Sequence, residues 1–166
     1  FGLSLATAGL LGAASGLGNV ATRAAGGWMS DASARAFGMR GRLWLLWASL
    51  AASGAASLLL GLAHDSLALS VVALLAFAGA AQFACGAVFG VVPFVSRRSN
   101  GAVTGIVSAG GTAGGALMQA ALFGGTFSPL RSDQAYYVGF YWLGAAILAG
   151  SLVAALVHFP PWGGML

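Results

Sequence analysis

The chain has 166 residues, of which 59% are hydrophobic and only 6% are charged. Soluble domains carry about 25% charged residues, so the composition excludes an ordinary soluble protein and indicates a membrane protein. The ionic side chains are seven arginines and three aspartates, which give a net charge of +4. This basic balance does not indicate nucleic-acid binding, because the arginines form no long basic face.

The chain contains five apolar segments that are long enough to cross a bilayer, which takes about 20 residues per helix. We therefore expect an all-α membrane protein, with one bundle over residues 1–166 and helices at about 3–29, 43–63, 67–95, 101–127 and 135–159. The chain begins at Phe1 inside an apolar segment, without a charged region before it. We expect part of a longer protein rather than a chain with a signal peptide.

The arginines are distributed unevenly between the two sides of the predicted bundle. The loops at 30–42 and 96–100 carry five of them, and the opposite loops carry only Arg131. The positive-inside rule places these two loops and the C-terminus in the cytoplasm of a plasma-membrane protein. The short connections also predict that consecutive helices are antiparallel neighbours.

The sequence offers little for catalysis. Its aspartates and histidines all lie at predicted membrane edges, so no carboxylate pair, metal-ligand cluster or activated nucleophile can be assembled. We expect no enzymatic activity, no metal and no cofactor. Cys85 lies in an apolar run, which favours an inert packed cysteine over a reactive thiol.

Arg23 is the only formal charge in the first predicted helix, eight residues before Asp31 and about 12 Å from it along the axis. An arginine at a helix centre costs about 2.5–3.5 kcal/mol to insert. No acidic residue lies within a predicted membrane helix, so its partner is water, a backbone carbonyl, a residue outside this chain or a transported anion. Guanidinium donors match oxyanions well. Snorkelling to the cytoplasmic edge and a structural contact are the alternatives.

The apolar segments contain two further candidate features, a polar residue near Arg23 and a stripe of small residues. Asn19 lies one helical turn before Arg23, where it either faces the same cavity or forms an interhelical hydrogen bond. The fourth predicted helix carries a stripe of small residues, Gly105, Ala109, Gly111, Gly114 and Gly115. In lipid, such a stripe fits close helix packing, a path for a small solute, or sliding of the helix during alternating access.

Two stretches of the chain are ATRAAGGWMSD followed by GMRGRLW, and FVSRRSNGAVTGIVSAGGTAGG. They resemble the nitrate/nitrite porter family of the major facilitator superfamily. The first is similar to the family's eighth helix and the cytoplasmic loop after it, and the second to its nitrate signature in the eleventh helix. The resemblance covers nearly the whole chain, as helices eight to twelve of a twelve-helix fold, and is closest to the high-affinity algal, plant and cyanobacterial branch.

The resemblance implies transport of nitrate, or of nitrite, by alternating access, with proton symport in the algal and plant branch and anion exchange as the bacterial alternative. It makes Arg23 one half of an anion clamp. The implied substrate-binding set is Arg23, Asn19, Gly105, Ala109, Gly111, Gly114 and Gly115.

The resemblance also implies a charge latch in the cytoplasmic loop, built from Asp31, Arg35, Arg40 and Arg42. A simple helix-end role is the alternative for Asp31. The implied partners are the anion, the lipid bilayer, the N-terminal half of the same chain and a small accessory membrane protein, with no nucleic acid. The competing hypotheses are a transporter of another small anion and a membrane scaffold without transport activity.

Overall fold

The computed structural model describes residues 4–63, 65–96, 98–123 and 135–156. In chain order it consists of α1 (Leu5–Leu62), α2 (Leu67–Val91), the short 3₁₀ helix η1 (Val92–Phe94), α3 (Asn100–Phe123) and α4 (Ala135–Leu156). The described ranges contain no strand, which confirms the predicted all-α fold. Each of the four α-helices is long and apolar enough to cross a membrane.

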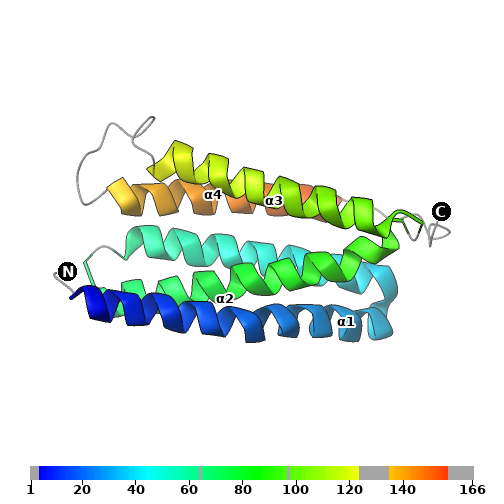
Figure 1. The fold of residues 1–166 in the computed structure, drawn as a ribbon, viewed down its shortest axis with the longest axis horizontal. Coiled ribbons are helices and arrows are strands. Elements are labelled where there is room, and N and C mark those ends of the chain that lie inside the picture. The colour runs from blue at the N-terminus through cyan, green and yellow to red at the C-terminus, as the bar shows by residue number, and fades with distance from the viewer. Residues whose placement is uncertain (1–3, 64, 97, 124–134, 157–166) are drawn as a thin grey trace.

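The longest helix, α1, folds back on itself at Gly38, where φ is 62° and ψ is −148°. This backbone conformation is accessible to glycine and strained for residues with a Cβ atom. Gly38 divides α1 into a first arm, residues 5–37, and a second arm, residues 39–62, which run in opposite directions (Figure 1). Both arms contribute to the bundle as separate rods.

The prediction of a loop at 30–42 is wrong, because the chain is helical on both sides of Gly38. That prediction treated the polar residues of this segment as irregular structure. Ala32, Ala34 and Ala36 are strong helix formers, and the segment contains no proline that would end the helix. A single glycine is enough to reverse the chain, so the charges here do not mark a helix end.

The other helix boundaries follow local signals. α2 begins after Ser66, whose Oγ accepts a hydrogen bond from the Leu69 amide at 3.4 Å. It ends at Val91 rather than near residue 95, because Pro93 has no N–H for a further helical hydrogen bond, and η1 follows. The remaining positions predicted as helical, 124–127 and 157–159, lie outside the described residues.

The rods lie side by side in one elongated bundle (Figure 1). The first arm and α2 run in the same direction, and the second arm, which connects them in the chain, runs in the opposite direction (Figure 1). α1 packs mainly against α2 and α4, whereas α3 packs against α4 and η1. The Gly38 reversal and η1, which leads into the arginine-containing segment at 96–100, lie at the same end of the bundle (Figure 1).

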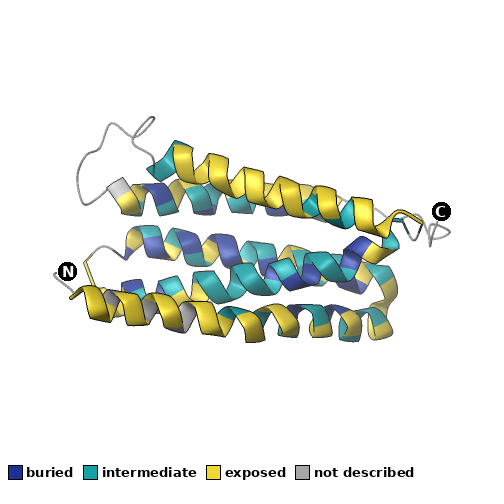
Figure 2. Ribbon diagram, in the orientation of Figure 1, coloured by how far each residue is buried: buried dark blue, intermediate teal, exposed yellow. Residues whose placement is uncertain are grey.

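Small residues form the core of this bundle. Ala73 and Ala87 are fully buried, and Ser57 of the second arm donates a hydrogen bond to the Phe140 carbonyl oxygen of α4 at 2.8 Å. Large apolar side chains such as Leu17 and Trp28 are exposed instead, and α3 is exposed along most of its length (Figure 2). This distribution suits helices that approach closely while their outer faces contact lipid.

Candidate functional site

Arg23 lies near the middle of the first arm with an exposed side chain. Its guanidinium carbon lies 5.2 Å from the centroid of the Phe89 ring on α2. Among the described residues, Arg23 forms no ion pair or side-chain hydrogen bond. One face of the cation is therefore supported by an aromatic ring, while its N–H donors are available to a further partner.

The direction of the Arg23 side chain follows from the backbone beside it. The Arg23 carbonyl oxygen faces Gly86 so closely that a Cβ atom on Gly86 would overlap it. Phe89 lies three residues further along α2, roughly 4.5 Å toward the Gly38 end of the bundle. The guanidinium group therefore stays beside α2 and takes no part in the ion pair described below.

Asn19 is half-buried on the same arm, one turn before Arg23. Its backbone carbonyl accepts a hydrogen bond from the Thr22 hydroxyl at 3.3 Å, and the same hydroxyl donates to the Gly18 carbonyl at 3.0 Å. Within the described part of the chain, no hydrogen bond of the Asn19 carboxamide is formed. The interhelical hydrogen bond considered for Asn19 is thus absent from this part of the structure.

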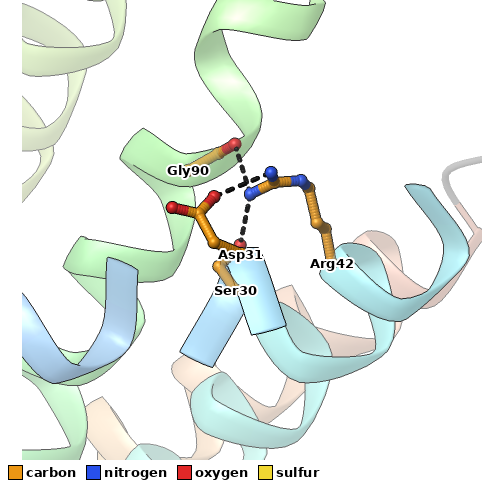
Figure 3. A network of polar contacts seen from close by, with 4 residues as sticks. All are labelled: Ser30, Asp31, Arg42 and Gly90. Carbon is orange, nitrogen blue, oxygen red and sulfur yellow. Dashed lines mark hydrogen bonds and ion pairs between the residues drawn. The ribbon is translucent and has the colours of Figure 1, made fainter. Parts of the chain in front are cut away.

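A second arginine, Arg42, is the centre of a buried polar network at the Gly38 end (Figure 3). Its Nη2 lies 2.7 Å from Oδ1 of Asp31, and its Nη1 donates to Ser30 Oγ and to the Gly90 carbonyl oxygen, both at 3.1 Å. The Phe94 ring centroid lies 4.7 Å from its guanidinium carbon. Arg42 thereby joins both arms of α1 to the end of α2.

The local sequence explains how this network forms. The reversal at Gly38 returns the chain beside itself, so that Arg42 on the second arm faces Asp31 on the first. Pro93 ends α2, and Gly90 lies in its last turn, where carbonyl oxygens lack their usual helical donors. A Cβ atom on Gly90 would lie 2.6 Å from Ser30 Oγ and 3.3 Å from Arg42 Nη1, so a larger residue there would crowd both groups.

The structure therefore selects one arginine from the predicted latch. Arg42 pairs with Asp31, whereas Arg35 and Arg40 are exposed and pair with no carboxylate in the described ranges. The role of this cluster in gating stays a prediction.

The glycine stripe lies apart from both arginines. Gly105, Ala109, Gly111, Gly114 and Gly115 are all exposed on α3, and a Cβ atom on any of the four glycines would meet nothing within 4 Å. Gly114 and Gly115 line a pocket of about 520 Å³ between α3 and α4, together with Gln119, Phe123, Tyr136 and Phe140. No polar or ring contact joins the stripe to Arg23 among the described residues, so its share in substrate binding stays a prediction.

The residues that sequence reasoning missed are the partners of the two arginines on α2 and η1. Phe89 and Phe94 lie in an apolar run where no pattern separates them from lipid-facing aromatics. Ser30 and Pro93 did carry signals, because one precedes Asp31 and the other ends a helix. Cys85 is a half-buried free thiol, and no group of three or more metal-ligating side chains lies together in the described ranges.

The long apolar helices and the exposed apolar faces define the class: the chain is part of an all-α integral membrane protein. The chain is 45% identical over its whole length to Nitrate transporter 2.1 of Chlamydomonas reinhardtii and covers 30% of that protein. It is 43% identical over 99% of its length to High affinity nitrate transporter 2.5 of Arabidopsis thaliana, of which it covers 32%. It is also 41% identical over its whole length to High-affinity nitrate transporter 2.3 of Oryza sativa subsp. japonica, covering 31%.

These matches identify the chain as a member of the nitrate/nitrite porter family, as its two motifs predict. The chain spans about a third of the length of the curated relatives it matches. These relatives are named as transporters and not as enzymes. No family model matches the chain, and no solved structure matches it either.

Proposed function

We propose that the protein containing this chain moves nitrate, or nitrite, across the plasma membrane by alternating access, as a proton-coupled symporter. The names of its relatives support nitrate as the transported anion. In this proposal the chain supplies helices eight to twelve of a major facilitator fold, and the rest of the protein supplies the other half of the anion site. The lipid bilayer and a small accessory membrane protein are the further partners.

The observation that carries the proposal is that Arg23 is a cation without a carboxylate partner among the described residues. It is a permanent cation in a lipid-spanning arm, with a ring on one face and no carboxylate partner in the described ranges. Nitrate is a planar monoanion, and a guanidinium group can donate two parallel hydrogen bonds to its oxygens. Arg23 then forms half of an anion clamp, with Asn19 and the glycine stripe of α3 lining the path.

The network around Arg42 has a separate role in the same proposal. The Gly38 reversal and the segment at 96–100 face the cytoplasm, in line with their arginines, and the C-terminus follows on the same side because successive helices alternate in direction. The Asp31–Arg42 pair then acts as a latch that favours one access state and opens in the other. Arg35 and Arg40 are exposed, and their part is to strengthen the positive charge on the cytoplasmic side.

Uptake of isotopically labelled nitrate by the full-length protein, expressed in cells that lack their own nitrate uptake, tests the clamp. We expect Arg23→Ala to reduce uptake to less than a tenth of the wild-type value at an equal amount of protein in the membrane. Arg23→Lys keeps the charge but not the paired donors, so we expect an intermediate uptake with a raised KM.

Arg98→Gln is the matched control, because Arg98 is an exposed arginine outside both clusters. Its uptake should equal that of the wild type. Normal nitrate uptake by Arg23→Ala would disprove the clamp. If the wild-type protein takes up a different small anion but no nitrate, that anion is the substrate instead of nitrate.

A further inference from the structure

The first arm and α2 cross at a point where each helix presents a glycine to a backbone carbonyl of the other. A Cβ atom on Gly26 would overlap the Phe83 carbonyl oxygen, and one on Gly86 would overlap the Arg23 carbonyl oxygen. In each helix the glycine follows its carbonyl residue by three positions, so the contact is reciprocal. Such crossings bring Cα–H groups against carbonyl oxygens, and they fix the separation of the two helices and their position along each other.

The close approach is confined to this point. A Cβ atom on Gly27, the next residue along the first arm, would lie 3.8 Å from the Gly86 carbonyl oxygen. A Cβ atom on Gly79, two turns earlier in α2, would lie 3.8 Å from Cγ2 of Thr22. Both are ordinary van der Waals separations, and a Cβ atom on Gly90 would meet the side chain of Ser30. Between the first arm and α2, only Gly26 and Gly86 would therefore overlap main-chain atoms of the other helix.

At this crossing, Arg23 contacts α2 through its backbone carbonyl and through its guanidinium group. Its carbonyl group lies against Gly86, and its guanidinium group stacks on Phe89, one turn further along α2. The depth and direction of the cation are therefore set by α2 and not by the first arm alone. A small separation of the two helices would move the guanidinium group relative to any anion that it binds.

We infer that Gly26 and Gly86 are positioning residues for the anion site, because their reciprocal contact fixes where Arg23 presents its donors. The inference rests on the proposed function of Arg23. A methyl group at either position must separate the backbones or rotate one helix, since the obstructing atoms belong to the main chain. A displacement of about 1 Å at a site that needs aligned hydrogen bonds can weaken it by up to about 100-fold.

Two pairs of variants in the full-length protein test this inference. Gly26→Ala is compared with Gly27→Ala, and Gly86→Ala with Gly79→Ala, so that each member of a pair adds one methyl group to the same helix. We expect Gly26→Ala and Gly86→Ala to raise the KM for nitrate at least tenfold, with the maximal rate per transporter in the membrane changed less than twofold. Gly27→Ala and Gly79→Ala should stay within twofold of the wild type in both.

A second measurement avoids dependence on delivery to the membrane. In purified protein, the rise in unfolding temperature on adding nitrate should be present in Gly27→Ala and Gly79→Ala and largely lost in Gly26→Ala and Gly86→Ala. Equal behaviour within each pair would overturn the inference. Unfolded Gly26→Ala and Gly86→Ala proteins would also overturn it, because the crossing would then serve folding alone.

Arg23→Ala, measured in parallel, distinguishes a failure of the proposed function from a failure of the positioning role. If Arg23→Ala transports nitrate normally, the proposed function fails. If Arg23→Ala is inactive while the crossing variants keep a wild-type KM, only the positioning role fails.

Discussion

Arg42 and Arg23 are both arginines on α1, in opposite surroundings. The Arg42 side chain is 9% exposed and has a carboxylate, a hydroxyl, a carbonyl and an aromatic ring as partners. Arg23 is exposed, and its guanidinium group contacts the Phe89 ring and no carboxylate among the described residues. A cation that binds a carboxylate, a hydroxyl and a carbonyl of its own chain joins helices, whereas a cation in a lipid-spanning arm whose donors have no such partners is suited to a ligand.

The largest expected effect tests this contrast directly. Arg42→Gln leaves Asp31 and the Gly90 carbonyl without their donor, so we expect the free energy of unfolding to fall by about 3 kcal/mol. Arg23→Gln should change it by less than about 0.5 kcal/mol. Titration of the purified protein with SDS in mixed micelles measures both values.

Arg40→Gln is the control for Arg42→Gln, since Arg40 is an exposed arginine two residues earlier. Its stability should match that of the wild type. A larger destabilisation by Arg23→Gln than by Arg42→Gln would reverse the comparison.

The second prediction concerns the glycine that brings Asp31 and Arg42 together. Gly38→Ala forces a residue with a Cβ atom into a positive-φ conformation, and we expect a loss of about 2 kcal/mol. Gly18→Ala is the control, because a Cβ atom there meets nothing within 4 Å in a regular helix. It should be neutral, or stabilising by up to about 1 kcal/mol. The same titration compares them, and equal stability of the two variants would contradict a strained reversal.

The third prediction isolates the ion pair within the Arg42 network. The Asp31 side chain is 59% exposed, so Asp31→Asn should lower stability by only about 1 kcal/mol. Salt screens exposed pairs, and the difference from the wild type should shrink between low and high ionic strength. An effect as large as that of Arg42→Gln, unchanged by salt, would show that the carboxylate is the main partner of Arg42.

The smallest expected effects come from the two rings. Phe94→Leu removes the ring beside the buried Arg42 and should lower stability by about 1 kcal/mol, and Phe89→Leu, beside the exposed Arg23, by about 0.5 kcal/mol. Thermal unfolding of the two purified variants ranks them. The reverse ranking would indicate that Arg23 is desolvated and Arg42 is not.

Much of the fold follows from the sequence, because apolar length decides where helices can cross a membrane. The capping residue Ser66 and the helix-ending Pro93 are local signals that can be found without coordinates. The segment at 30–42 could not be assigned correctly, because its polar residues are compatible with both a loop and a helix. Only the φ angle of Gly38 shows that one residue makes the turn.

The two arginine sites were predictable to different extents. A lone charge in an apolar helix identifies Arg23, but its contact with Phe89 depends on how α2 lies against the first arm. A cluster of opposite charges identifies Asp31 and three arginines, whereas the choice of Arg42 depends on the reversal at Gly38. In both cases the sequence identifies the arginine as a candidate site residue, whereas tertiary packing determines which residues it contacts.

The continuous first arm connects these two sites mechanically. The crossing is centred between Arg23 and Gly26, so Arg23 lies roughly 2 Å on one side of it and Phe37 roughly 19 Å on the other, at 1.5 Å per residue. If the arm tilts about this crossing as a stiff rod, a movement at the Gly38 end reaches Arg23 reduced to roughly a tenth and reversed in direction. An opening of several ångströms at the Asp31–Arg42 pair would thus become a fine adjustment of the position of the Arg23 backbone.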